Sequence, residues 1–319
     1  MIGDTTISRW KDDKQCAYSL CADDSLHSHL DFMAPEMIKR GFTGTFWINP
    51  GGGESMSDGR CWISRKAEWL ALVRAGFDFA NHTMHHHGAK TFEEADYEIG
   101  ECARVILECI PSQRLQLFLR GGATDWLISE EDINALADKY NCIPGRGGGM
   151  CDQVWHETDQ VTDTELDMIP AVENALRTGS WRIGAFHGVG PKAEWLCTDA
   201  AAFIALLDYL YDNKDAIWVG NNTDVHKYMI EYAHAQQPSA AIRENGITVT
   251  LVVNHPRLDL YDYPLTLKTE VPPYWENCLV IQGNKRTSRP VRNGRVMYEA
   301  TPGKGDVRLE NFIGRRRII

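Results

Sequence analysis

The sequence lacks the long apolar run that a membrane-spanning helix requires. No stretch of about eighteen consecutive apolar residues occurs, so a transmembrane helix is excluded and we expect no membrane partner. The N-terminal stretch from Met1 to Lys14 has no apolar signal core after a basic start. We therefore expect either a cytoplasmic protein or a secreted one whose leader has been removed.

Basic residues and paired cysteines are also scarce. Lysine and arginine total 33 against 44 acidic residues, which gives a formal charge of −11. The negative electrostatic potential of such a protein repels the phosphate backbone of nucleic acids, so we expect no nucleic-acid partner. None of the nine cysteines forms a CxxC pair, which excludes a zinc ribbon or a thioredoxin-like site. Because several of them lie inside apolar stretches, we predict reduced thiols.

What the sequence does contain is a regular alternation of short apolar runs with amphipathic segments, from Cys16 to about Ala235. The apolar runs are rich in Phe, Trp, Ile and Val, as buried parallel strands are. They are Cys16–Cys21, Gly44–Asn49, Phe77–His82, Gln116–Arg120, Arg182–His187 and Ala216–Gly220. The predicted helices are Arg65–Ala75, Phe92–Ile110, Ser129–Tyr140, Thr198–Asp212 and Thr223–Ala235. This order predicts an α/β fold, either a barrel or a doubly wound sheet.

The pattern changes after the polar stretch Gln236–Ser239. Strand patterns then follow one another without an intervening helix pattern, and Asn293-Gly294 is a strong hairpin signal. We therefore expect two domains, an α/β domain over residues 1–237 and a small antiparallel β domain, sandwich-like, over residues 240–319.

Two adjacent carboxylates, Asp23 and Asp24, follow the first apolar run. Neighbouring carboxylates are costly to bury without a cation, and strand ends of β/α folds are where active sites are built. The alternative is that the pair caps the N-terminus of the next helix.

A cluster of histidines follows the third apolar run. His82 and His86 are four residues apart, so a helical turn would place both imidazoles on one side of a metal ion; in an irregular segment His85 or His87 could replace one of them. The alternative is a surface cluster. One carboxylate and two imidazoles leave coordination positions open for water and substrate, which favours catalysis. The second aspartate is then free to accept a proton from water.

Other candidate residues lie at strand ends and in the loops that follow them. His187 is interpreted as a general acid or, alternatively, as a structural histidine. Arg120 could hold the base aspartate in its charged form or could equally be an ordinary surface arginine, and Arg146 competes for the first role. Trp126 and Arg146 are candidates for substrate binding, although core packing explains a tryptophan equally well.

These motifs resemble those of the polysaccharide deacetylases of carbohydrate esterase family four. The family's Thr-Phe-Asp-Asp motif is matched at the aspartate pair of Cys21-Ala22-Asp23-Asp24, and its His-Ser/Thr-x-x-His motif by His82-Thr83-Met84-His85-His86. The similarity covers roughly residues 14 to 235. The family's Arg-x-Pro-Tyr motif is not matched, because Arg120 is followed by two glycines.

The resemblance implies a distorted (β/α) barrel, a divalent metal with Zn²⁺ as the expected ion, and hydrolysis of N- or O-acetyl groups on a carbohydrate. It implies Asp23 as the base, Asp24, His82 and His86 as metal ligands, and His187 as the acid. We therefore expect a metal-dependent carbohydrate deacetylase whose partner is an acetylated carbohydrate.

Two alternative functions remain open. The same site could hydrolyse a C–N bond in an amide that is not a sugar, or the chain could be a non-catalytic carbohydrate-binding protein. For the C-terminal β domain we expect a cap on the barrel or a contact in a homo-oligomer before a glycan-binding role.

Overall fold

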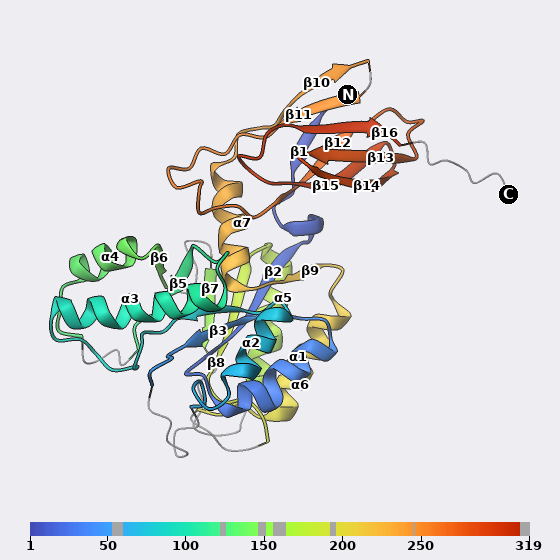
Figure 1. Ribbon diagram of the computed structural model, residues 1–319. Helices are drawn as coiled ribbons and strands as arrows, with labels where there is room; N and C mark the ends of the chain where they lie inside the picture. Colours follow the sequence, from blue (N-terminus) through green and yellow to red (C-terminus); the bar gives the residue numbers. More distant parts are fainter. Residues whose placement is uncertain are drawn as a thin grey trace. The chain divides into compact units, whose positions relative to one another are not determined.

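The computed structural model describes residues 1–52, 60–121, 126–145, 151–155, 164–191, 196–244 and 246–312 (Figure 1). The chain divides into two compact units, one of Cys16–His226 and one of Met1–Gln15 with Lys227–Ile319. Residues 1–15, expected in the barrel, thus belong to the C-terminal unit. The reason is that β1 (Thr5–Ile7) pairs antiparallel with β12 (Leu265–Glu270).

A parallel sheet forms the centre of the first unit. Its strands are β2 (Cys16–Asp23), β3 (Thr45–Ile48), β4 (Asp78–Asn81), β5 (Gln116–Phe118), β6 (Cys142–Pro144), β7 (Cys151–Trp155), β8 (Trp181–Phe186) and β9 (Ile217–Val219). The order is β6-β5-β4-β3-β2-β8-β7, and β9 pairs with the start of β2. The predicted α/β class with a parallel sheet is confirmed. Because β2, β3, β4 and β8 run in the same direction, the residues that follow them meet at one edge of the sheet.

Helices flank this sheet, and several begin with the capping residues that the sequence offers. They are α1 (Ala34–Lys39), α2 (Lys66–Arg74), α3 (Phe92–Cys109), α4 (Glu130–Lys139), α5 (Thr164–Thr178) and α6 (Ala200–Asp212), with a π-helix η2 (His29–Met33). Helix α7 (Asn222–His234) begins in this unit and ends in the other, to which the 3₁₀ turn η1 (Lys11–Asp13) belongs. The hydroxyl of Thr91 accepts from Glu94 N before α3, and that of Ser129 from Asp132 N before α4. Each such cap satisfies an otherwise unpaired backbone donor.

An aromatic core fixes the strands that lead to the candidate site. The Phe46 ring of β3 lies 5.3 Å from Trp69 of α2 and 5.6 Å from Phe77. Trp62 packs edge-on to Phe79 of β4 at 5.3 Å. Buried aromatic rings contribute large apolar areas with defined geometry, so β3 and β4 are held rigidly where they end.

The C-terminal unit is an antiparallel β structure, as expected. Besides β1 and β12, its strands are β10 (Ser239–Arg243), β11 (Gly246–Thr250), β13 (Asn277–Gln282), β14 (Lys285–Arg292), β15 (Arg295–Ala300) and β16 (Val307–Asn311), in the order β1-β12-β15-β14-β13-β16-β11-β10. The predicted hairpin is confirmed, since Asn293 and Gly294 join β14 to β15 with φ values of 52° and 73°. Positive φ at both positions is what a type I′ turn requires.

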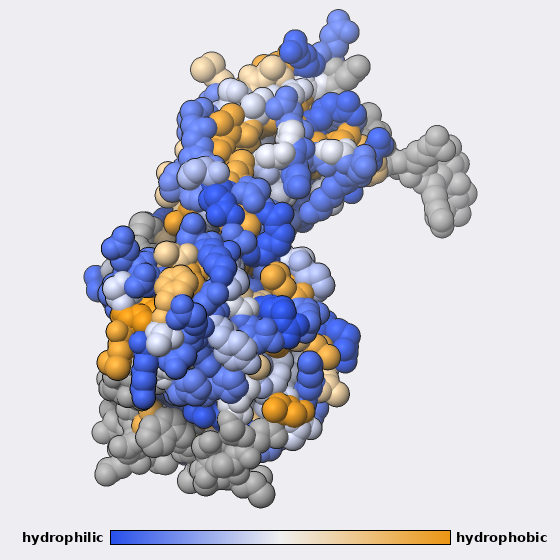
Figure 2. All heavy atoms as spheres, turned by 60° about the vertical axis from the view of Figure 1, so that its left-hand side comes forward, coloured by the Kyte–Doolittle hydropathy of each residue, from blue (hydrophilic) through white to orange (hydrophobic). Residues whose placement is uncertain are grey.

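The surface and the thiols agree with the composition. On the face shown in Figure 2 most residues are hydrophilic, and hydrophobic residues occur in small groups. No helix in the described ranges has both the length and the apolarity needed to cross a membrane. The thiols for which the structure describes the side chain are free, as predicted, at positions 16, 21, 61, 102, 109, 142, 197 and 278.

Candidate metal centre

The residues that follow β2 and β4 bring Asp24, His82 and His86 together. His86 Nε2 lies 3.1 Å and His82 Nε2 lies 3.5 Å from Asp24 Oδ1. The three ligand atoms lie within 4.8 Å of one another. In a tetrahedral site with metal–ligand bonds of about 2.0–2.1 Å, ligand atoms are about 3.3 Å apart. The observed spacing therefore suits a single ion.

The histidine segment is an irregular turn, the second of the two backbone paths that the sequence left open. Thr83 and His86 have φ values of 68° and 57°, which no right-handed helix contains. Asn81 holds the turn, because its side-chain oxygen accepts from Thr83 N at 3.0 Å. The rings of His82 and His86 still meet, with centroids 4.8 Å apart. The predicted ligands therefore converge by a different backbone path.

A hydrogen bond to a backbone carbonyl fixes the orientation of the His82 ring. Its Nδ1 lies 3.0 Å from Leu119 O, and a carbonyl can only accept, so Nδ1 carries the proton. The lone pair of Nε2 then faces Asp24. A hydrogen bond from the second ring nitrogen to a backbone carbonyl is the usual support of a metal-binding histidine.

Asp24 itself provides the test of whether an ion fits. The residue is only 3% exposed, and among the described residues its Oδ1 accepts no hydrogen bond. Burial by itself would raise the pKa of Asp24, but His82, His86 and His187 outweigh it and hold that pKa well below its usual range. A buried, charged oxygen without a hydrogen bond, faced by imidazole nitrogens, fits a divalent cation. Two imidazoles with one carboxylate occur at zinc sites and at non-haem iron(II) sites.

Arg60 is a member of the cluster that the sequence reasoning missed. Its Nη2 lies 3.3 Å from His86 Nδ1 and 4.0 Å from Asp24 Oδ1. A guanidinium only donates, so in this arrangement His86 accepts at Nδ1 and its proton sits on Nε2, 3.1 Å from Asp24 Oδ1 but outside hydrogen-bond geometry. Burial lowers the pKa of His86, so the ring is neutral, and an ion at Nε2 requires its proton to move to Nδ1, where Arg60 now donates. No motif marks Arg60, which reaches the site through a bridge to Leu26.

Asp23 and His187 lie in the same cluster. Asp23 ends β2, is buried, and is close enough for its charge to oppose the burial that lowers the pKa of His86. His187 follows β8, and its Nε2 lies 3.8 Å from Asp24 Oδ2. The structure thus gathers the predicted base, the predicted acid and the predicted ligands at one edge of the sheet.

His29 supports His187 and was not predicted. Leu26 N donates to His29 Nδ1 at 3.2 Å, so Nε2 carries the ring proton and donates to His187 O at 2.8 Å. Complete burial lowers the pKa of His29 to about 4, which keeps the ring neutral in this tautomer. The only sequence signal was its position, five residues after Asp24.

Arg120 has a different partner from the one expected. Its Nη1 donates to Glu130 Oε1 of α4 at 2.7 Å, on the surface, instead of supporting Asp23. The next residue, Gly121, lies against the histidine turn. A Cβ atom on Gly121 would lie 2.7 Å from His86 Cδ2 and 2.8 Å from His82 O, so a larger residue would displace the histidine turn.

Of the two residues predicted to bind substrate, Trp126 and Arg146, the structure describes only Trp126. Trp126 is half-buried, donates from Nε1 to Gly121 O at 2.7 Å, and packs against the core between α3 and α4. This placement agrees with the alternative interpretation of core packing. Arg146 lies outside the described residues.

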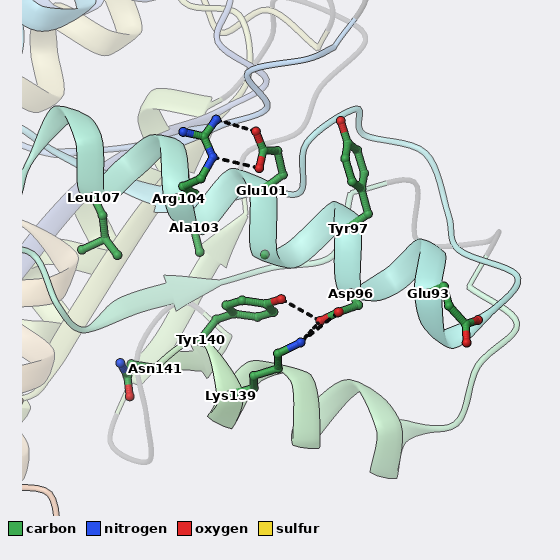
Figure 3. A pocket seen from close by; sticks show the side chains of 11 residues that line it. Glu93, Asp96, Tyr97, Glu101, Ala103, Arg104, Leu107, Lys139, Tyr140 and Asn141 are labelled. Carbon is green, nitrogen blue, oxygen red and sulfur yellow. Dashed lines mark hydrogen bonds and ion pairs between the residues drawn. The ribbon is translucent and has the colours of Figure 1, made fainter.

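A groove of about 600 Å³ runs along α3 beside residues 139–141 (Figure 3). Two ion pairs, Arg104 with Glu101 and Lys139 with Asp96, line it, and the Tyr140 hydroxyl donates to Asp96 at 2.7 Å. None of its lining residues belongs to the Asp24 cluster. We therefore assign no part of the chemistry to this groove.

Comparisons of the chain with known proteins give similarities at low sequence identity. No protein-family model matches it. It is 23% identical over 339 residues to a gellan lyase from Bacillus sp; the match covers 96% of this chain but only 13% of that relative's length.

Two solved structures are similar to about two thirds of the chain. One is a probable polysaccharide deacetylase from Pseudomonas aeruginosa PAO1, with 10% identity, a TM-score of 0.47, and coverage of 70% of this chain and 93% of that one. The other is a family 4 acetyl xylan esterase from Clostridium thermocellum in complex with a cobalt ion, with 16% identity, a TM-score of 0.45, and coverage of 66% and 89%.

Proposed function

We propose that the chain is a metal-dependent hydrolase that removes acetyl groups from a carbohydrate. The observation that carries this proposal is the convergence of Asp24, His82 and His86 around one buried carboxylate oxygen, with Asp23 and His187 beside them. A structural metal site would be closed by four protein ligands, whereas this set of three leaves room for water and substrate.

Asp24, His82 and His86 would hold the ion. A divalent ion in this position supplies Lewis-acid chemistry, which polarises a carbonyl and acidifies water. Arg60 opposes the ion, because its bond to His86 Nδ1 keeps the ring proton on Nε2 and its positive charge lies 4.0 Å from Asp24 Oδ1. Entry of an ion therefore requires the Arg60 contact to open.

Asp24 and Asp23 take different roles, ligand and base, because their surroundings differ. Three histidines keep Asp24 ionised, which suits a ligand. Asp23 remains available to accept the proton of the attacking water as its oxygen bonds to the acetyl carbon. His187 donates a proton to the departing amine or alcohol as the C–N or C–O bond breaks, and acetate is the second product. His29 acts as a positioning residue, since it holds the backbone of His187.

The substrate class rests on the motif resemblance, which implies acetylated carbohydrates. The test is acetate release from acetylated xylo- and chito-oligosaccharides by protein stripped with a chelator and then reloaded with Zn²⁺, Co²⁺ or Fe²⁺. A panel of small non-sugar amides runs alongside. We expect release that depends on the added ion and falls at least about a thousandfold in Asp24→Ala.

The matched control is Asp96→Asn, which loses an exposed ion pair away from the cluster. Acetate release that is indifferent to chelation and to Asp24→Ala would refute the proposal. Activity confined to the amide panel would transfer the site to a non-sugar substrate. Carbohydrate binding without hydrolysis would favour the non-catalytic alternative.

A further inference from the structure

The histidines on either side of His86 face a second carboxylate. His85 Nδ1 lies 2.7 Å and His87 Nε2 lies 3.5 Å from Glu98 Oε1 of α3. The ligand atoms of these three residues lie within 4.8 Å of one another. The left-handed backbone at His86 produces this arrangement, because His85 and His87 then present stacked rings, 5.3 Å apart and nearly parallel, to Glu98.

The tautomer of His87 prepares it to bind a cation. Its Nδ1 lies 2.9 Å from Gly88 O, which can only accept, so the proton is on Nδ1 and the lone pair of Nε2 faces Glu98. In the neutral ring, two electron-rich atoms 3.5 Å apart repel each other unless a proton or a metal cation lies between them. The distance is close to the separation of about 3.3 Å expected for two ligands of one tetrahedral ion.

Glu98 is a deeply buried carboxyl group. The side chain is 2% exposed, and one oxygen accepts from His85 N at 2.8 Å. In the part of the chain that the structure describes, Glu98 forms no ion pair with lysine or arginine. A buried carboxylate needs compensation by positive charge, and a divalent cation provides it.

The ring of His85 is already held in place for this role. It stacks on Tyr97 at 5.8 Å, and a Cβ atom on Gly51 would lie 2.6 Å from its Nε2, so only glycine fits at position 51. An ion bound to Nδ1 requires the His85 proton to move to Nε2 and the contact with Glu98 to lengthen by about 0.6 Å, to the tetrahedral spacing. Because Tyr97 and Gly51 already restrict the His85 ring, little conformational entropy of this side chain is lost when an ion binds.

We propose that His85, His87 and Glu98 form a second divalent-cation site, open to solvent, for a zinc-type ion. It is separate from the Asp24 cluster but shares its backbone turn. His87 is 64% exposed, so the ion exchanges with solvent more readily than one at Asp24. The proposal does not depend on the deacetylase function, since it concerns only the number of bound ions.

The test counts ions at equilibrium. The protein is stripped with a chelator, dialysed against Zn²⁺, and analysed for bound metal. The variants are His87→Ala, Glu98→Gln and Asp24→Ala, and the matched control is His234→Ala, which removes an exposed histidine outside both clusters. We expect two equivalents in the unmodified chain and in the control, and one in each of the other variants.

The outcomes separate the two sites. Loss of all bound metal in Asp24→Ala would overturn the proposal, as would retention of two equivalents in both His87→Ala and Glu98→Gln. If the chain binds one ion that survives Asp24→Ala and is lost in His87→Ala, the second site stands and the Asp24 site fails. Glu98→Gln keeps the shape of the side chain and an acceptor for His85 N, so it covers the case of a His87→Ala variant that does not fold.

Discussion

Gly121 is the residue whose replacement most directly tests the geometry of the metal centre. In Gly121→Ala the new methyl group would lie 2.7 Å from His86 Cδ2, 2.8 Å from His82 O and 3.0 Å from the His86 Cα atom. Ordinary contacts are about 3.5–4.0 Å, so the turn must retreat by several tenths of an ångström or more. Two of the three obstacles are backbone or Cα atoms, which cannot rotate away.

The expected cost has two parts. Overpacking of this kind destabilises a protein by about 1–3 kcal/mol. A shift of His86 also changes its separation from Asp24 Oδ1, now 3.1 Å, and metal–ligand distances tolerate only about ±0.2 Å. We expect Zn²⁺ affinity at the Asp24 site to fall by about 10- to 100-fold, as for loss of a group that supports a ligand.

The assay is competition for Zn²⁺ with a chelator of known affinity, together with urea denaturation of the same samples. The control is Gly41→Ala, where the methyl group meets no atom within 4 Å but the φ of +74° strains any other residue. Gly41→Ala should lose about 1–2 kcal/mol and keep its metal affinity. Equal metal affinity in Gly121→Ala and the unmodified chain would refute the reasoning.

Three further predictions follow from the same contacts. Arg60→Ala removes a positive charge that opposes the ion, so Zn²⁺ should bind at least about tenfold more tightly. Arg60→Lys keeps the charge, so its Zn²⁺ affinity should not rise. Weaker Zn²⁺ binding in Arg60→Ala would contradict this reasoning. His29→Phe removes the donor to His187 O and should lower kcat with little change in KM. His29→Gln retains an N–H donor and should recover part of the rate. Equal rates in the two variants would contradict a positioning role for His29. Burial raises the pKa of Glu231 to about 9, so the Glu231 carboxyl group keeps its proton in the folded protein, whereas in the unfolded chain it loses the proton above about pH 4.5. The free energy of unfolding therefore falls as the pH rises toward 9. Glu231→Gln should therefore stabilise the chain in urea denaturation at pH 7 and more so at pH 9, by at most about 1.4 kcal/mol per pH unit, and a pH-independent difference would exclude this origin.

Local patterns predicted most of the parallel sheet and its helices. The apolar runs placed β2, β3, β4 and β8 within a few residues of their observed bounds, because buried parallel strands need continuous apolar sequence. They did not predict α5, whose sequence contains Pro170, a residue that argues against a helix interior. They also left residues 1–15 with the barrel, since the pairing of β1 with β12 joins segments some 260 positions apart.

The sequence by itself determined which donor atoms were available and that each follows a buried strand. Parallel strands bring such positions to a common edge, so Asp24, His82 and His187 were found without coordinates. Only the tertiary structure decided which histidines face which carboxylate. That choice depends on the sign of φ at Thr83 and His86, and residues without glycine's freedom adopt positive φ only where surrounding contacts, such as those of Asn81 and Glu98, impose it. Arg60 and His29 entered the site by the same route, through long-range contacts that no local pattern encodes.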